Sequence, residues 1–321
     1  MNLNNYSKAI VAGITAQVIW GVAGLLVKVV LDSVPPFSLL FLRSLFTCLI
    51  LYLILEYRVI KKKYLPTQPG LINMPGQRLE NSEKRDIFWA AMTGVVLNIA
   101  FYFVGQRLTT VIDAWIINST GALFVIVISY IFLRERLSKI VYAGVVLAFL
   151  GTIIIVGTPI LQAGSGSFLG NVLMLGSVFA FSISYILTKK LTTRFSPLLL
   201  TYYFFLVGLI FSFPLFLWEF WQNPGWIASI TVSGYLIIAY LSIGSSILAY
   251  SLDNFALIYL SASITATIGY VSVVVAVALG IIFLHEQMTP FFLIGSALTF
   301  AGLFLAEIRH THHPLHKLHR R

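Results

Sequence analysis

The chain has 321 residues, of which 59% are hydrophobic and only 10% are charged, and its formal net charge is +10. Soluble domains carry about 25% charged residues, so this composition excludes a soluble enzyme built around one large core. The apolar residues gather in runs that recur along almost the whole chain. The sequence therefore predicts an all-α integral membrane protein.

Ten apolar runs are long enough to cross a bilayer. About 20 helical residues, at about 1.5 Å each, span a hydrocarbon layer of about 30 Å. The first run is too long for the apolar core of a signal peptide, so we expect it to remain as a membrane anchor. The predicted transmembrane helices are residues 9–31, 37–57, 86–106, 112–133, 139–157, 168–188, 197–218, 234–257, 261–284 and 290–308.

The basic residues follow the order of these spans. When the spans alternate from a cytoplasmic N-terminus, nearly all of the 21 Lys and Arg residues fall on the cytoplasmic side. Cytoplasmic loops of membrane proteins carry such an excess, so the positive charge needs no nucleic-acid partner. We predict an inner or plasma membrane protein with both termini in the cytoplasm.

Two stretches of the sequence repeat each other. "IFLRERLSKIVYAGVVLAFLGTIII" (131–155) and "IFLHEQMTPFFLIGSALTFAGLFLA" (282–306) share an acid and several glycines at one register. The copies lie five spans apart, an odd number, so they cross the membrane in opposite directions. Inverted five-helix repeats typify secondary transporters, whose substrate site lies between the halves near the middle of the bilayer.

The front parts of the two halves match more weakly. Lys28 and Pro36 align with Lys189 and Pro197, whereas Trp20 and Arg43 align with phenylalanines. The predicted units are a first repeat (1–157, with a basic cytoplasmic loop at 58–85), a second repeat (158–309) and a basic tail (310–321). The tail contains several histidines, which indicates either metal binding or contact with anionic lipid headgroups.

Four motifs resemble a known family. They are "IWGVAGLLVK" (Ile19–Lys28), "LLFLRSLF" (Leu39–Phe46), "FLRERLS" (Phe132–Ser138) and "FLHEQMT" (Phe283–Thr289). They resemble the EamA-like branch of the drug/metabolite transporter superfamily over nearly the whole chain, apart from the loop at 64–86 and the tail. The resemblance implies a ten-helix exporter or exchanger of small metabolites with a central cavity.

Polar residues at helical spacing within five spans predict the lining of that cavity, because polar groups exposed to lipid are costly. Each side chain has an alternative role: the tryptophans and tyrosines can serve packing alone, and the asparagines can bond neighbouring helices. The candidates are Gln17, Trp20, Asn98, Tyr102, Trp115, Asn118, Ser119, Ser246, Tyr250, Thr267 and Tyr270.

Charged residues near the spans have more specific predictions. Asp253 lies inside the eighth span, where it can couple transport to protons or face a cationic substrate, or else reach the cytoplasmic interface. Lys28 and Arg43 lie near the outer ends of their spans, where they can reach headgroups or pack the first hairpin. Glu135 and Glu286 precede helices that begin at Ser138 and at Thr289–Pro290, so we expect both acids to be structural.

Several motifs are missing from the sequence. It lacks a GxxxxGK[ST] phosphate loop, so ATP does not drive transport directly, and His285–Glu286 lacks the second histidine of a zinc protease. We expect no cofactor and no metal centre. The favoured function is a secondary transporter of a small molecule, with proton coupling at Asp253. The alternatives are a lipid flippase, with Lys28, Arg43 and Lys189 on the phosphate, and an intramembrane enzyme, for which we find no paired catalytic residues.

Overall fold

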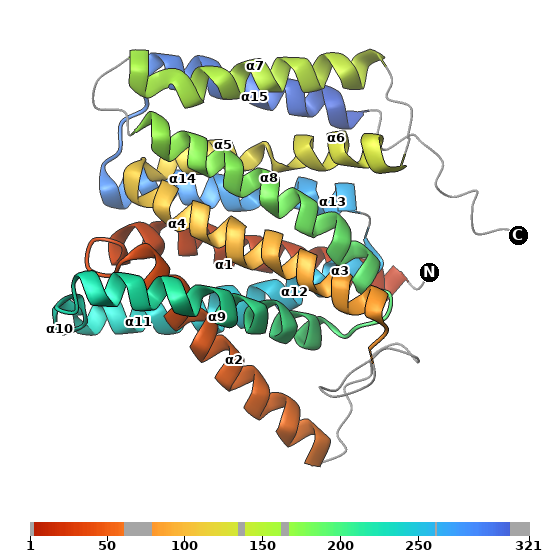
Figure 1. The fold of residues 1–321 in the computed structure, drawn as a ribbon. Helices are drawn as coiled ribbons and strands as arrows, with labels where there is room; N and C mark the ends of the chain where they lie inside the picture. The colour runs from red at the N-terminus through yellow and green to blue at the C-terminus, as the bar shows by residue number, and fades with distance from the viewer. Residues whose placement is uncertain (1–2, 61–78, 134–138, 162–166, 261, 309–321) are drawn as a thin grey trace, which may run out of the picture.

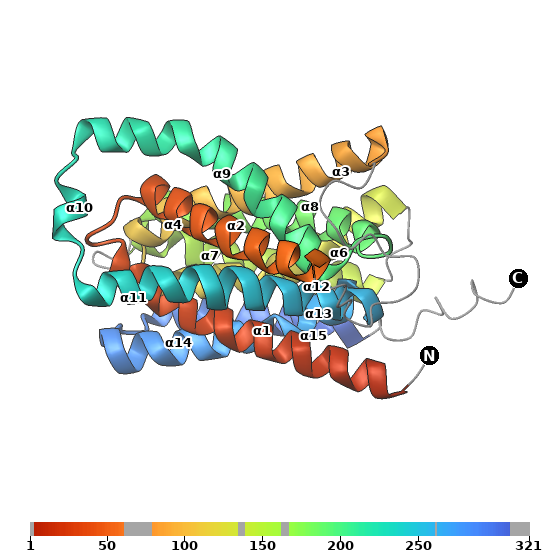
Figure 2. The same cartoon turned by 90° about the horizontal axis from the view of Figure 1, so that it is seen from below.

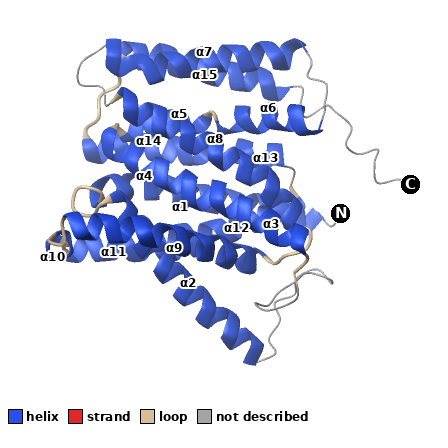
Figure 3. Ribbon diagram, in the orientation of Figure 1, coloured by secondary structure: helices blue, strands red, loops and turns tan. Residues whose placement is uncertain are grey.

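The computed structural model describes residues 3–60, 79–133, 139–161, 167–260 and 262–308. All regular elements in these ranges are helices (Figure 3). By length and composition, 7 helices of the described chain can cross a membrane, and three shorter apolar helices accompany them (Val111–Val125, Tyr142–Gly157 and Pro290–Gly302). Together they match the ten predicted spans and confirm a helical multi-span membrane protein.

The helices divide into two sets that follow the predicted repeat. The first set comprises α1 (Leu3–Val30), α2 (Pro36–Ile60), α3 (Asn81–Ala91), η1 (Met92–Leu97), α4 (Asn98–Leu108), α5 (Val111–Ser119), α6 (Gly121–Leu133) and α7 (Lys139–Leu161). The second comprises α8 (Phe168–Leu191), α9 (Pro197–Gln222), α10 (Trp226–Ser229), α11 (Val232–Tyr240), η2 (Leu241–Ala249), α12 (Tyr250–Tyr259), α13 (Ala262–Ile268), α14 (Tyr270–Leu284) and α15 (Pro290–Ile308).

The long helices lie side by side in one bundle. The start of α1 and the end of α15 lie at the same end of it (Figures 1 and 2). We call this end the terminal face and the opposite end the distal face. Helices α7 and α15 pack together along one edge, whereas α2 packs on α9 at the opposite edge, so each pair joins one helix from each repeat (Figure 1).

Glycines shared by the two sequence copies lie where α7 crosses α15. A Cβ atom at Gly151 would lie 2.5 Å from the carbonyl oxygen of Gly295, and one at Gly302 would lie 2.5 Å from that of Gly144. Only residues without a side chain allow two backbones to approach so closely. The glycines of the repeated motif therefore set the contact between the two halves.

Two helices of each repeat are irregular, at corresponding positions. The π-helical segments η1 and η2 interrupt the third helix of each repeat, and breaks at Thr120 and Gly269 divide the fourth. When the two repeats are aligned as in the copies 131–155 and 282–306, η1 aligns with residues inside η2. In the same alignment, the break at Thr120 falls next to the break at Gly269. The predicted spans at 86–106 and 234–257 therefore contain a π-helical segment, and those at 112–133 and 261–284 contain a break. At the first break, the Thr120 hydroxyl donates to the Ile117 carbonyl and so competes with helix continuation.

Candidate functional site

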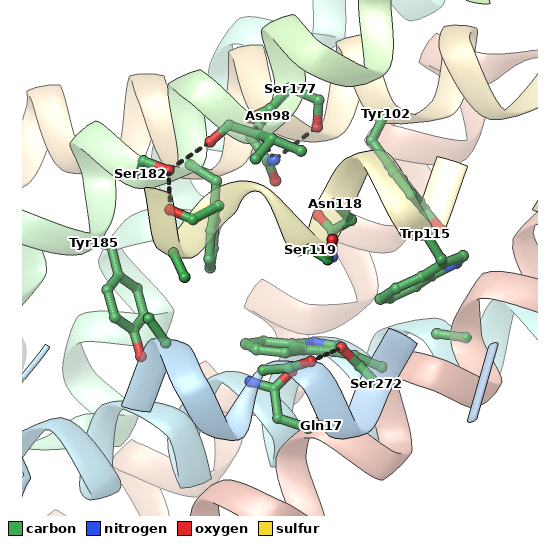
Figure 4. Close-up of a pocket in the computed structure, with 18 of the residues that line it drawn as sticks. Gln17, Asn98, Tyr102, Trp115, Asn118, Ser119, Ser177, Ser182, Tyr185 and Ser272 are labelled. Carbon is green, nitrogen blue, oxygen red and sulfur yellow. Dashed lines mark hydrogen bonds between the residues drawn. The ribbon is translucent and has the colours of Figure 1, made fainter. Parts of the chain in front are cut away.

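A cavity of about 150 Å³ lies in the middle of the bundle, between helices of both repeats. Most residues predicted for the cavity line it. They are Gln17, Trp20, Asn98, Tyr102, Trp115, Asn118, Ser119, Tyr250 and Tyr270. Figure 4 shows Tyr102, Trp115, Asn118 and Ser119 converging on this space from the first repeat, with Gln17 and Ser272 on the opposite side.

Aromatic rings form much of the cavity wall. The ring of Trp20 stands edge-on to Tyr250, with 5.1 Å between centroids, and also contacts Phe181. Its indole Nε1 donates to the backbone oxygen of Ser245 at 3.0 Å. This bond joins α1 to η2, so it fixes the orientation of Trp20 and links the two repeats.

The indole of Trp115 occupies the space above Gly24. A Cβ atom at Gly24 would overlap the Trp115 ring. The ring of Tyr102 also stands edge-on to Trp115, with 6.3 Å between ring centroids. The absence of a side chain at Gly24 is therefore the reason that Trp115 can fold back onto the cavity rather than away from it.

Asn98 contacts both the cavity and a neighbouring helix. Its Nδ2 donates to the hydroxyl of Ser177 at 2.8 Å and to the Ser177 backbone oxygen at 3.0 Å, so it joins α4 to α8 (Figure 4). Ser182, also on α8, donates to the Gly121 backbone oxygen at the break between α5 and α6. These bonds anchor the irregular part of the first repeat to α8.

The prediction for Ser246 is wrong. Ser246 is fully buried behind the cavity, and Ser245 lines the cavity instead. The hydroxyl of Ser246 donates to the Leu241 backbone oxygen, five residues earlier, at 2.9 Å. A π-helical turn holds one more residue than an α-helical turn, so α-helical spacing through η2 selects the wrong serine.

Thr267 lies on α13, but its side chain is outside the described part of the chain. Thr265, two residues earlier, lines the cavity beside Tyr270. The break at Gly269 separates Thr265, on α13, from Tyr270, on α14. A four-residue stripe drawn across the break therefore missed Thr265.

Asp253 is buried one layer behind the cavity wall. Only 3% of the residue is exposed, and it does not line the cavity. Gln17 Nε2 lies 3.5 Å from its Oδ1, and the hydroxyl of Tyr185 bonds the same carboxyl group. Gln17 and Tyr185 themselves line the cavity. This burial argues against an interfacial carboxylate and places Asp253 one hydrogen bond away from the cavity.

The placement of Arg43 near the membrane surface is wrong. Arg43 is 5% exposed and lines the cavity. Its Nε donates to the hydroxyl of Ser246 at 2.5 Å and its Nη2 to that of Ser245 at 3.0 Å. The guanidinium also lies over the rings of Phe205 and Phe103, at 5.6 and 6.0 Å. It binds the second repeat because α2 packs against η2.

Lys28 binds the end of a neighbouring helix rather than headgroups. Its Nζ donates to the backbone oxygens of Gln106 and Thr109, at 3.0 and 2.6 Å, where α4 ends. Unpaired carbonyls at a helix C-terminus favour a positive charge. Lys28 therefore caps α4 at the distal face.

Lys189 repeats this contact at the terminal face. Its Nζ donates to the backbone oxygens of Leu257 and Leu260, where α12 ends. These two carbonyls correspond to those of Gln106 and Thr109 at the spacing of the sequence repeat. The two lysines that the flippase alternative assigns to a phosphate are thus bonded to the backbone.

Glu286 caps a helix of the opposite repeat. Its two carboxylate oxygens accept the backbone N–H groups of Val111 and Ile112, at 2.8 and 2.9 Å, where α5 begins. The expected cap of α15 is supplied by Thr289, whose hydroxyl accepts the Phe292 N–H at 3.1 Å. The helix served by Glu286 was therefore predicted incorrectly. Glu135, Ser138 and the tail lie outside the described residues.

Sequence reasoning missed the buried acid Asp113. It is 4% exposed in the first turn of α5, and its backbone N–H is bonded to the N-cap residue Thr110. Asn171 of α8 reaches its carboxylate at 3.5 Å and also bonds the hydroxyl of Thr109. The Thr-x-x-Asp pattern of a helix N-cap is visible in the sequence. Asp113 lies at the start of the predicted span 112–133, so the sequence did not indicate that it is buried.

The described part of the chain contains no group of three or more His, Cys, Asp and Glu residues that could hold a metal ion. The arrangement instead offers hydrogen bonds, aromatic surface and charge within a cavity between two related halves. Such a site can bind and release a small molecule.

The model of the EamA-like transporter family matches residues 7–157 and 168–307, one match for each half of the chain. The chain belongs to the EamA-like transporter family. This result confirms the resemblance read from the sequence motifs. The protein is a multi-pass membrane transporter of the drug/metabolite transporter superfamily, and not an enzyme.

Relatives and a solved structure cover nearly the whole chain. An uncharacterized transporter of Archaeoglobus fulgidus is 29% identical over 91% of this chain and 95% of its own length. The uncharacterized transporter YcxC of Bacillus subtilis is 24% identical over 94% and 93%. A crystal structure aligns with a TM-score of 0.62 over 94% of this chain and 96% of its own, at 16% identity, and shows the same fold.

Proposed function

We propose that this EamA-family protein is a secondary transporter that exports or exchanges small metabolites by alternating access. The observation that carries the proposal is the central cavity, which residues of both repeats line. A site between inverted halves becomes accessible from either side when one half moves relative to the other. The proposed halves are residues 1–157 and 158–309, in an inner or plasma membrane with both termini in the cytoplasm.

The irregular helices support a moving cavity wall. The fourth helix of each repeat is broken at Thr120 or Gly269, beside the cavity. Half-helices joined by a short connection can rotate separately, because few backbone hydrogen bonds cross the break. The paired breaks give each half one such element, and the two would alternate in opening the cavity.

A soluble substrate is favoured over a lipid. The flippase alternative required Lys28 and Lys189 to bind a phosphate, but both ammonium groups already bind helix-end carbonyls. The third cation, Arg43, lies within the central cavity. None of these three cations is therefore free at the surface of the bundle to bind a lipid headgroup.

Asp253 is the proposed coupling residue. It lies one hydrogen bond behind the cavity wall, and Gln17 links it to the space that the substrate occupies. A carboxyl group in this position can exchange a proton when the cavity opens and respond to the arrival of substrate. Transport would then follow a pH gradient.

Counterflow in proteoliposomes tests the function. Vesicles loaded with an unlabelled amino acid or aromatic carboxylate should transiently accumulate the same labelled compound, and protein-free vesicles should not. Gly24→Ala should lower the initial rate because the added methyl group displaces Trp115, whereas Gly13→Ala meets only ordinary contacts at 3.4 Å or more. No counterflow with any compound that the folded protein binds would contradict the proposal.

A further inference from the structure

We propose that Arg43 binds the anionic group of the substrate, so that the cavity selects small organic anions, carboxylates first, with an apolar or aromatic body. This inference rests on the proposed transport function and deepens it. It assigns to the cavity a chemical class of cargo and names the residue that recognises it.

The charge of Arg43 lacks a counter-charge in the described structure. The guanidinium is almost fully buried, and its bonds go to the neutral hydroxyls of Ser245 and Ser246. The ion pairs found among the described residues lie elsewhere, on Asp86, Glu80 and Glu83 near the ends of α3 and α8. An uncompensated charge in a membrane interior is costly, and an anion in the cavity would remove that cost.

The guanidinium retains donors for such an anion. Arginine has five N–H donors, and the bonds of Arg43 to described residues use Nε and Nη2. The Nη1 group makes no hydrogen bond within the described chain. A carboxylate can accept two parallel N–H bonds from one guanidinium, and Arg43 lines the space in which it would lie.

The surrounding rings suit the remainder of the ligand. The guanidinium lies over the rings of Phe205 and Phe103, and Trp20 and Tyr250 present aromatic surface to the cavity. Rings that exclude water strengthen an ion pair because the local dielectric constant is low. They also offer contact area to an apolar body.

The second repeat has no equivalent cation. The residue that corresponds to Arg43 is Phe204, which is 2% exposed within the hydrophobic core. Residues that build the fold, such as Lys28 and Lys189, occur in both repeats. A charge present in one repeat alone gives the cavity a single anion site.

Asp253 lies too far away to serve as the partner of Arg43. It follows Ser245, a partner of Arg43, by eight residues along η2 and α12, and unlike Arg43 it does not line the cavity. A ligand bound to Arg43 in the cavity therefore has no direct contact with Asp253, because Gln17 lies between that carboxyl group and the cavity. The anion site and the proposed coupling carboxyl are therefore separate, and an α-amino group is not required for binding.

Matched ligand pairs test the proposal on detergent-purified full-length protein. Phenylacetate and phenylacetamide share one body, as do hexanoate and hexanamide, and differ only in charge. Wild-type protein should show a larger rise in melting temperature with each carboxylate than with its amide. Arg43→Gln should weaken carboxylate binding roughly 10- to 100-fold and remove the difference, and Arg43→Lys should retain part of it.

A second variant pair keeps the test valid if Arg43→Gln does not fold. Ser245→Asp puts a carboxylate beside Nη2, where the serine hydroxyl now lies at 3.0 Å. It should raise the melting temperature of the free protein and abolish the response to carboxylates. Ser245→Asn, of the same size but neutral, should not raise the melting temperature and should weaken the carboxylate response far less than Ser245→Asp does. Equal responses to acids and amides in wild-type protein, or a preference that survives Arg43→Gln, would overturn the anion site.

Counterflow then separates this inference from the transport function. If neutral or cationic compounds exchange as well as carboxylates do, and Arg43→Gln exchanges them at the wild-type rate, the protein is a transporter without the proposed anion site. If carboxylates bind through Arg43 but never exchange, the anion site stands and the transport function is wrong.

Discussion

Lys28 and Lys189 make the same bond at opposite ends of the bundle, in different surroundings. Each donates to the last carbonyls of the third helix in its own repeat, α4 at the distal face and α12 at the terminal face. Near Lys28 the buried acid is Asp113, on α5. Near Lys189 it is Asp253, which precedes the capped carbonyl of Leu257 by one turn of α12.

These two acids are not repeat-related. The residue that corresponds to Asp113 is Ile264, and the one that corresponds to Asp253 is Tyr102. The lysine caps, the helix breaks and the interhelical glycines occur twice, whereas Arg43, Asp113 and Asp253 occur once. Duplicated residues therefore hold the architecture. Arg43, which lines the cavity, and Asp253, one hydrogen bond behind it, are the candidates for transport chemistry, whereas Asp113 does not reach the cavity.

The largest expected effect separates the two acids. Asp253→Asn preserves the shape of the side chain and its contact with Gln17 but cannot release a proton, so accumulation driven by a pH gradient should be lost. Counterflow should continue, because it needs no gradient. Asp113→Asn is the matched control and should keep both activities. Gradient-driven uptake that survives Asp253→Asn in proteoliposomes would assign coupling elsewhere.

Removal of the lysine caps should reduce stability at both ends, more at the distal one. Lys28→Met leaves three backbone oxygens without their donor and should lower the free energy of unfolding by about 3 kcal/mol. Lys189→Met leaves two and should cost about 2 kcal/mol. Lys8→Met, at an exposed site, provides the control. Equal losses for all three variants in denaturation experiments would contradict the capping role.

Cysteine labelling compares the cavity walls of the two repeats. In a Cys48→Ser background, cysteine at Asn98 or Tyr102 in the first repeat and at Ser245 in the second should react with a small water-soluble thiol reagent. Cysteine at Ser246 or at Leu97, which is 39% exposed on the outside of the bundle, should react at least about tenfold more slowly. Faster labelling at Ser246 than at Ser245 would show that this helix is regular rather than π-helical.

The smallest effect concerns the helix caps near the distal face. Glu286→Gln loses the charge at the start of α5 and one of two accepted bonds, which should cost about 1–2 kcal/mol. Thr289→Ala removes the single cap bond of α15 and should cost about 1 kcal/mol. Denaturation of both variants under one condition measures the difference. A larger loss for Thr289→Ala would mean that Glu286 contributes little to α5.

The sequence alone determined the spans, the inverted repeat and much of the cavity lining. These features depend on local or periodic properties. An apolar run either is or is not long enough to cross a bilayer, and Trp20, Tyr102 and Asn118 are recognisable as large or polar residues in the middle of such runs. The cap at Thr289 with Pro290 was likewise readable, because an N-cap involves residues three positions apart.

The tertiary structure alone decided where the charged side chains bond. Arg43 reaches the cavity because α2 packs on η2, and Glu286 caps α5 because the end of α14 lies beside it. Both contacts join residues far apart in the chain, and no local pattern encodes them. The choice of Ser245 over Ser246 depends on a π-helical turn, which adds one residue and rotates every later side chain.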